Sequence, residues 1–185
     1  MRTLALALTL VLSLSISVPA RAAVDETNAN RLNALGLFLG TGSGYDLGGS
    51  ATRLHGIIML TRMLGEEADA LSFDGPCPFS DVAAGKPSAY TGYAFAQGYT
   101  TGVSTTTFRP NGALSFKHYV TFLLRALGYD DGAGDFTFAA SLDKAVEIGM
   151  MTRASADCIL QKQYAFYRGD LVDLSVSALT TPLAD

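Results

Sequence analysis

The sequence predicts an all-α protein, built from three similar helix-loop-helix units with little or no β structure. Two observations lead to this fold class. Apolar residues in the longer helical segments recur at three- and four-residue steps, which places them along one face of a helix. A pair of helical segments, separated by a loop, also occurs three times along the chain. The repeated unit is therefore a supersecondary motif.

The first helix of each unit is a short helical pattern that ends in glycine. The three patterns occupy residues 32–36, 90–98 and 142–149. In the first two units, polar and turn-rich loops follow at residues 40–44 and 102–107. These loops lead to Tyr45 and Phe108, two aromatic residues that we expect to pin each loop to its helices.

The second helix of each unit is longer and more clearly repeated. Residues 52–65 and 115–128 both close on Leu-Gly, and a weaker third copy covers residues 167–180. Thr52 and Ser115 are good N-caps, because a hydroxyl oxygen accepts hydrogen bonds from the free amides of the first turn. Gly65 and Gly128 then end the helices in the left-handed conformation that glycine tolerates. In the second copy, the residues expected to face the core are Phe116, Tyr119, Val120, Leu123, Leu124 and Leu127.

Composition excludes several classes of protein. The chain has 185 residues, of which 49% are hydrophobic and only 16% charged, so it is not a disordered tail. Its formal net charge of −4 leaves no basic field for wrapping nucleic acid. The length suits one domain of ordinary size with a real hydrophobic core.

Residues 1–22 are typical of a secretory signal peptide. Arg2 gives a positive start, an apolar run follows from Leu4 to Val18, and a small-x-small cleavage site ends at Ala22. A retained anchor helix is the alternative, but this run is shorter than the roughly 20 residues needed to span a bilayer. Cleavage changes the formal charge from −4 to −6. Since no later segment is long and apolar enough to cross a membrane, we expect a secreted protein held at the cell surface by recognition.

The two cysteines, Cys77 and Cys158, fit an oxidising compartment. An even count favours one disulfide over a metal site, which would need more ligands. Such a disulfide would close a long loop and stabilise the fold by roughly 4 kcal/mol in the chain-entropy account. The alternative is a pair of buried thiols, because sequence does not establish that the two residues are close.

The second unit carries a specific order of motifs. These are Phe79-Ser80-Asp81-Val82, the helix ending Ala96-Gln97-Gly98-Tyr99, the segment Phe108-Arg109-Pro110 and the block closing Leu124-Arg125-Ala126-Leu127-Gly128. Together they resemble a surface-layer homology (SLH) repeat. The resemblance covers three consecutive repeats, at residues 28–70, 77–130 and 135–180, and implies helical units packed with pseudo-threefold symmetry. Such modules hold exported bacterial proteins on the cell wall by binding a secondary polysaccharide, often one that bears a pyruvate ketal.

A ketal carboxylate is a fixed anion on a neutral sugar. A site for it needs a guanidinium, amides from a helix start or glycine loop, and an aromatic wall. Arg53 is the best candidate for the guanidinium and Arg168 the second; the alternative is that both are solvated or pair with an acid such as Asp81. The predicted binding residues are Arg53, Thr52, Gly40, Gly42, Gly102, Arg109, Arg168 and Asp170.

In SLH repeats the second helix opens with Thr-Arg-Ala-Glu; Thr52-Arg53 fits the first two positions, and Arg168 and Asp170 fit the basic and acidic ones. The chain departs from this pattern at several other positions. Phe116 occupies the basic position of the second repeat, which leaves two grooves with a cation. His55 and His118 replace the acid of the motif, and we expect an uncharged His not to accept from the amide of the cap residue as an acid would. Only Asp170 retains that role. Arg153 stands in the third loop in place of a glycine, where it either adds a cation or removes a turn residue.

Catalysis is not predicted. His55 and His118 hold the same place in two repeats, which favours a structural role, and no nucleophile elbow or zinc spacing accompanies them. The acids around Asp130 lack the spacing of a calcium loop. The sequence therefore predicts no cofactor and no metal site.

We expect a non-catalytic, exported module that binds an anionic secondary cell-wall polysaccharide. The main alternative is a protein-interaction or surface-assembly domain, in which the same fold has lost its sugar sites and binds other surface proteins. A third alternative is a small secreted hydrolase that uses His55 or His118.

Overall fold

The computed structural model describes residues 25–162 and 165–184, and the predicted signal peptide at residues 1–22 lies outside them. The described ranges contain helices and isolated β-bridges but no strand, which confirms the all-α prediction. None of the helices in these ranges has the length and apolarity needed to cross a membrane. In chain order the helices are α1 (Thr27–Ala34), α2 (Arg53–Met63), α3 (Glu67–Leu71), α4 (Lys86–Ala96), α5 (Phe116–Ala126), α6 (Ser141–Glu147), α7 (Arg153–Lys162) and α8 (Arg168–Leu179).

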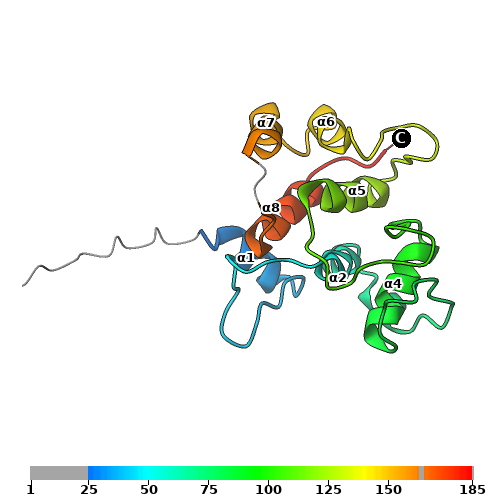
Figure 1. The fold of residues 1–185 in the computed structure, drawn as a ribbon. Helices are drawn as coiled ribbons and strands as arrows, with labels where there is room; N and C mark the ends of the chain where they lie inside the picture. Colours follow the sequence, from blue (N-terminus) through cyan, green and yellow to red (C-terminus); the bar gives the residue numbers. More distant parts are fainter. Residues whose placement is uncertain (1–24, 163–164, 185) are drawn as a thin grey trace, which may run out of the picture.

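Three long helices, α2, α5 and α8, form the centre of the molecule, and each contacts the other two (Figure 1). They are the second helices of the three predicted units. The buried side chains at this centre include Ile57 and Leu60 from α2, Leu171 from α8, and Tyr119 from α5. The hydroxyl of Tyr119, fully buried, lies 2.7 Å from Oγ of Ser175 on α8, so the polar tip is satisfied inside the core.

The first helix of each unit packs on the second helix of the preceding unit. Helix α4 contacts α2, and α6 contacts α5. Helix α1 contacts α8 in the same way, although the two lie at opposite ends of the chain (Figure 1). Each unit thus depends on its neighbour for burial of its apolar face, and the contact of α1 with α8 joins the first unit to the third.

Short extended segments before the central helices bind the units to one another through the backbone. The amide of Arg53 donates to the carbonyl of Gly112 at 3.0 Å, and that of Arg168 donates to Gly49 at 2.9 Å. The next amide along each helix also donates to the neighbouring unit, from Leu54 to Pro110 and, at the equivalent place, from residue 169 to residue 47. In the first turn of α2, two free amides therefore donate to the loop of the second unit, and in the first turn of α8 two donate to the loop of the first unit.

The predicted caps of α2 and α5 and the predicted glycine ends are confirmed, whereas α1 and α4 begin at Thr27 and Lys86, before the predicted starts at residues 32 and 90. Thr52 Oγ1 accepts from the amide of His55 at 3.2 Å, and Ser115 Oγ accepts from the amide of His118 at 3.3 Å. The glycines that close the helices all have positive φ, and the amide that follows each of them donates back to the carbonyl five residues earlier, as in a Schellman motif. They are Gly36, Gly65, Gly98, Gly128 and Gly149.

The prediction that an uncharged His cannot complete the cap is wrong for His55. Its Nδ1 accepts from the amide of Thr52 at 3.3 Å, which makes a reciprocal capping pair. A neutral imidazole supplies the acceptor through the ring nitrogen that carries no proton. In the second unit, Nδ1 of His118 lies 2.7 Å from Oγ of Ser115 instead. Asp170 accepts from the amide of Tyr167 at 2.8 Å, as predicted.

The third unit does not contain the loop that a helix-loop-helix reading predicts. Helix α7 stands where residues 40–44 and 102–107 form loops in the first two units. The change starts at Arg153, which replaces the loop glycine and begins α7, and its guanidinium pairs with Asp143 at 2.5 Å. A non-glycine residue at this point does not favour the left-handed turn with which Gly40 and Gly102 open their loops.

Candidate functional site

Arg53 extends from the start of α2 into the loop of the second unit. Its side chain is 2% exposed, and Nε donates to the carbonyl of Phe108 at 2.7 Å. The guanidinium carbon lies 4.7 Å from the centre of the Phe108 ring and 5.5 Å from that of Phe122. Burial, and then the charge of Arg109, lowers the pKa of Arg53 to about 10, against an opposing effect of Asp81. Arg53 therefore keeps its charge at neutral pH.

Arg168 holds the equivalent position at the start of α8 and reaches the loop of the first unit. Its Nε donates to the carbonyl of Tyr45 at 3.1 Å, and its guanidinium carbon lies 5.1 Å from the centre of the Phe38 ring. The two predicted aromatic residues, Tyr45 and Phe108, thus each anchor an arginine of another unit through the backbone carbonyl. Arg53 is held in place by one hydrogen bond and two aromatic rings, and Arg168 by one hydrogen bond and one ring.

Each arginine lines a groove made of equivalent residues. The Arg53 groove, of about 310 Å³, is lined by Arg53, Thr100, Thr101, Gly102, Val103, His118, Thr121, Phe122, Arg125, Asp131 and Phe138. The Arg168 groove, of about 200 Å³, is lined by Phe38, Leu39, Gly40, His55, Ile58, Met59, Arg62, Arg168 and Leu171. In both, the central helix contributes a histidine from its first turn and an arginine two turns later. The two grooves are copies of one site.

The second arginine of each groove is compensated by an acid. Arg125 makes two hydrogen bonds to Asp131, at 2.8 and 2.7 Å, and Arg62 donates to Glu67 at 2.8 Å. Arg53 and Arg168, by contrast, form no ion pair with any residue that the structure describes. The predicted alternative, a pair between one of them and Asp81, is therefore not formed. Nη1 of Arg53 is also buried without a hydrogen-bond partner among the described residues.

Asp81 instead holds the loop segment that carries the Phe108 carbonyl. Its two carboxylate oxygens accept from the amides of Phe108 and Arg109, at 2.8 and 2.7 Å. These hydrogen bonds lower the pKa of Asp81, with the bond from Phe108 as the largest cause. Arg109 has φ of 59°, and Asp46 at the equivalent place in the first unit has φ of 50°. The acid therefore holds a strained turn that sets the position of the Phe108 carbonyl.

The structure brings some of the predicted binding residues together and separates others. Gly40 and Gly102 line the two grooves, and a Cβ on either would lie within 2.8 Å of backbone oxygen, so only glycine fits. Gly42 is exposed in its loop. Arg109 is also exposed, and it does not line the Arg53 groove. Thr52 is occupied as an N-cap. The free helix-start amides expected near Arg53 are used by the neighbouring loop, so the guanidinium is the main group left for an anion.

Sequence reasoning missed four groove residues on α5. They are His118, Thr121, Phe122 and Arg125. Their spacing of three, one and three residues places them on one face of the helix, which is a signal the sequence contains. The matching face of α2 carries His55, Ile58, Met59 and Arg62. The sequence does not show that this helix face meets an arginine from a different unit.

Both histidines are neutral at neutral pH. Burial, and then the charge of Arg53, lowers the pKa of His118 to about 4. Burial and Arg168 lower the pKa of His55. Each ring also takes part in the cap of its own helix. Each histidine ring therefore takes part in a helix cap and also lines a groove.

The predicted disulfide between Cys77 and Cys158 is not formed, and both residues are free thiols in the structure. Cys77 lies beside α4, with Sγ 3.4 Å from Oγ1 of Thr91. Cys158 belongs to α7 in the third unit, where it lines a different cavity. The fold places the two thiols on separate units, so the even count of cysteines was not evidence of proximity.

No protein-family model matches the chain. The chain is 27% identical over 169 residues to the middle cell wall protein of Brevibacillus brevis. The match covers 90% of this chain but only 16% of that protein, so the chain spans about a sixth of its relative. This distant similarity points to a protein associated with the cell wall.

Proposed function

We propose that this protein is an exported, non-catalytic module that binds an anionic secondary cell-wall polysaccharide, such as one bearing a pyruvate ketal, through the Arg53 and Arg168 grooves. One observation carries the proposal: two equivalent grooves each contain a guanidinium that is fixed by an aromatic face and a carbonyl but has no acid partner among the described residues. The similarity to a cell wall protein and the resemblance to SLH repeats support it.

The chemistry of the grooves suits a carboxylate on a sugar. A guanidinium whose Nε is already occupied keeps its two Nη groups for an anion, and a fixed side chain loses little entropy on binding. The unpartnered Nη1 of Arg53 is a donor that an acceptor from a ligand or water would satisfy. The exposed Thr101 and the half-buried, neutral His118 in the Arg53 groove can bind sugar hydroxyls, and Phe138, which is 45% exposed, offers an apolar face for the ring.

Two observations support a non-catalytic role. His55 and His118 lie in different grooves, so they cannot act as a pair on one substrate. The pKa of His118 is about 4, well below the value near operating pH that suits a general acid or base. A binding role therefore suits these grooves better than the hydrolase alternative.

The test is retention of the mature protein on isolated cell-wall polysaccharide, with and without chemical removal of the pyruvate. We expect retention by the intact polysaccharide and at least tenfold weaker retention after removal. Retention by neither preparation, or equal retention by both, would contradict the proposal.

Two variants test whether Arg168 belongs to the binding site. Arg168→Gln removes the cation of one groove, and Arg31→Gln is a matched control because Arg31 is exposed on α1 and lines neither groove. We expect weaker retention for Arg168→Gln and unchanged retention for Arg31→Gln, with folding of both checked by thermal unfolding. Equal retention by both variants would mean that the assignment to Arg168 is wrong.

A further inference from the structure

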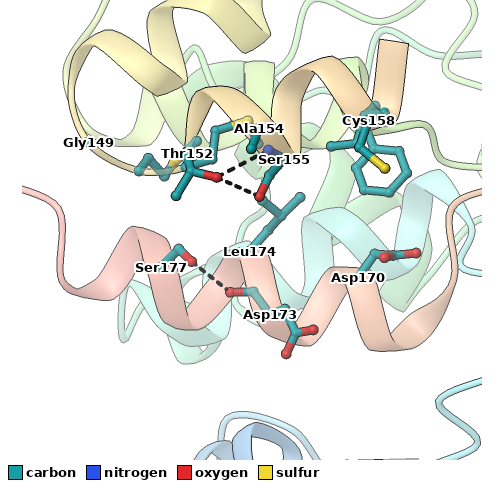
Figure 2. A pocket seen from close by; sticks show the side chains of 13 residues that line it. Gly149, Thr152, Ala154, Ser155, Cys158, Asp170, Asp173, Leu174 and Ser177 are labelled. Atoms are coloured by element: carbon teal, nitrogen blue, oxygen red, sulfur yellow. Dashed lines mark hydrogen bonds between the residues drawn. The ribbon is translucent and has the colours of Figure 1, made fainter. Parts of the chain in front are cut away.

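The third unit carries a groove at the place equivalent to the two arginine grooves, and it is the largest of the three. Its volume is about 930 Å³, within the range of about 300–1,000 Å³ typical of ligand pockets. It lies between α7 and α8, as Figure 2 shows, and Phe116 of α5 closes one side. The described residues that line this third groove are Phe116, Gly149, Met150, Met151, Thr152, Ala154, Ser155, Cys158, Ile159, Asp170, Asp173, Leu174 and Ser177.

A comparison of equivalent positions shows that the charge of the third groove is reversed. Phe116 stands where the other grooves have Arg53 and Arg168, and Ser177 stands where they have Arg62 and Arg125. Of the three remaining positions on the central helix, Leu174 is apolar like Met59 and Phe122, whereas Asp170 and Asp173 stand where the other grooves hold a histidine and an uncharged residue. An anionic ligand is therefore disfavoured in the third groove, because it would meet two carboxylates and no cation among the described lining residues.

Helix α7 gives the third groove a wall that the other grooves lack. Thr152 caps this helix, since its Oγ1 accepts from the amide of Ser155 at 3.1 Å and lies 2.8 Å from Oγ of Ser155. Ala156 is fully buried and ties the helix to the core. The replacement of a loop by a capped and packed helix is therefore a defined structural change.

The two carboxylates of the third groove lie in a setting that favours a cation. Burial, with the nearby charge of Asp173 as an additional cause, raises the pKa of Asp170, although the hydrogen bond from Tyr167 opposes this. Asp173 is exposed, and its Oδ1 accepts from Asn28 at 2.8 Å. Asp170 lies on the side of α8 that faces α7, whereas the carboxylate of Asp173 points away from α7 (Figure 2), so an ammonium or guanidinium group in the groove would meet Asp170 first.

We propose that the third groove binds a peptide segment of a partner protein, in which a bulky apolar side chain stands next to a lysine or arginine. The apolar residues of the groove, which are Phe116, Met150, Met151, Ile159 and Leu174, suit an apolar side chain better than a hydroxylated sugar. Methionines adapt their shape to different side chains and are frequent on peptide-binding surfaces. The two aspartates then select a basic neighbour by charge complementarity.

An array of hexapeptides composed of Lys, Glu, Ser, Leu and Phe, probed with the full mature protein, tests this preference. We expect the bound peptides to be enriched in Lys next to Leu or Phe. Enrichment in Glu, a preference for Ser, no preference, or no binding at all would overturn the proposal.

Alkylation of Cys158 tests whether the bound peptide lies in the third groove. The two cysteines are free: Cys158 lines the third groove (Figure 2), whereas Cys77 lies beside α4. The best basic peptide should slow alkylation of Cys158 by N-ethylmaleimide at least fivefold and leave the rate at Cys77 unchanged. Unchanged alkylation of Cys158 would show that the peptide binds elsewhere, and protection of Cys158 by cell-wall polysaccharide instead would make the groove a sugar site.

Two variants complete the test. Asp173→Asn keeps an oxygen for the hydrogen bond from Asn28 but removes the charge, and we expect it to weaken binding of the basic peptide five- to tenfold. The matched control is Asp157→Asn, because Asp157 belongs to α7 but does not line the groove. Phe116→Arg should abolish peptide binding, whereas Phe116→Leu should retain most of it. Equal binding by Asp173→Asn and the wild type would contradict the proposed role of the acids.

Discussion

The two arginine grooves and the third groove occupy equivalent places in the fold but differ in charge, size and wall. In the first two, an arginine from one central helix crosses to the loop of another unit, and its Nε donates to the carbonyl of Tyr45 or Phe108. In the third, Phe116 packs against Phe166 with ring centres 4.9 Å apart, and a helix replaces the loop. The comparison shows that the same packing of the central helices is compatible with a cationic groove at two places and with an apolar, acidic groove at the third.

The arginine grooves also differ from each other in how deeply the cation is buried. Arg53 is 2% exposed, whereas Arg168 is only partly buried. We expect Arg53→Ala to lower the free energy of unfolding by about 2–4 kcal/mol, because it removes a charged hydrogen bond and two aromatic contacts inside the protein. We expect Arg168→Ala to lower it by only about 1 kcal/mol.

Urea unfolding of the two alanine variants and the wild type measures this difference. The m-value serves as a control that all three proteins unfold as the same cooperative unit. If both variants lost the same stability, burial would not distinguish the two sites. Because Arg53 has this structural role, Arg168 is the cleaner position for testing binding alone.

The first-turn residue of the central helix gives the grooves opposite responses to pH. His118 has a pKa lowered to about 4, so its unfolded form binds a proton below pH 6.5 while the folded form does not, and stability falls as the pH drops from about 6.5 to 4. Asp170 has a raised pKa, so the folded form binds its proton first, and stability rises as the pH falls through that pKa.

Thermal unfolding between pH 7 and pH 4 tests this contrast. We expect His118→Gln to reduce the fall in Tm between pH 6.5 and pH 4.5 by about 2–4 °C, which corresponds to roughly 1 kcal/mol in a chain of this size. As the pH falls, the Tm of the wild type should rise relative to the Tm of Asp170→Asn. A pH profile that neither variant changes would mean that other groups, such as Asp81, dominate it.

The helix caps give the smallest expected differences between units. Thr52 and Ser115 cap α2 and α5 through their hydroxyls, whereas Tyr167 stands at this place in the third unit and is 43% exposed. We expect Thr52→Ala to destabilise the protein by about 1 kcal/mol. Tyr167→Thr should stabilise it by about 0.5–1 kcal/mol, because it adds a hydroxyl acceptor to a helix that already has the reciprocal bond to Asp170.

Denaturant midpoints of these two variants are the measurement. Ser115→Ala is the matched control, since it removes the same kind of cap from the second unit and should resemble Thr52→Ala. A loss of stability in Tyr167→Thr would show that the tyrosine makes contacts worth more than a cap.

Local features of the fold could be predicted from the sequence because they depend on neighbours in the chain. Thr52 and Ser115 cap their helices, and the glycines at their ends take positive φ, since both effects act within one turn. The apolar stripe of α5 was also predicted, with Tyr119, Val120 and Leu123 almost fully buried, although Phe116 is only partly buried and lines the third groove. The loss of a cation at Phe116 is also visible in the sequence, because the position holds arginine in the other two units.

The candidate site was only half predictable, because it joins residues of different units. Arg53 and Arg168 were found as candidates, but the loop residues they contact and the helix face opposite them follow from packing between units. Gly56 illustrates the same limit: a Cβ there would lie 2.9 Å from the side chain of Leu114, a contact that no local pattern indicates. The unpaired state of Cys77 and Cys158 likewise depends on where the units place them.

The sequence by itself determined the central helices α2, α5 and α8, the Thr52 and Ser115 caps and the glycine ends of the helices, because short-range hydrogen bonding and apolar periodicity depend on residues that are close in the chain. Only the tertiary structure decided that each first helix packs on the preceding unit, that α1 closes onto α8, and that an arginine of one unit lines the groove of another. The reason is physical: burial of apolar faces selects the partner of each helix, and that selection brings together residues from distant parts of the chain.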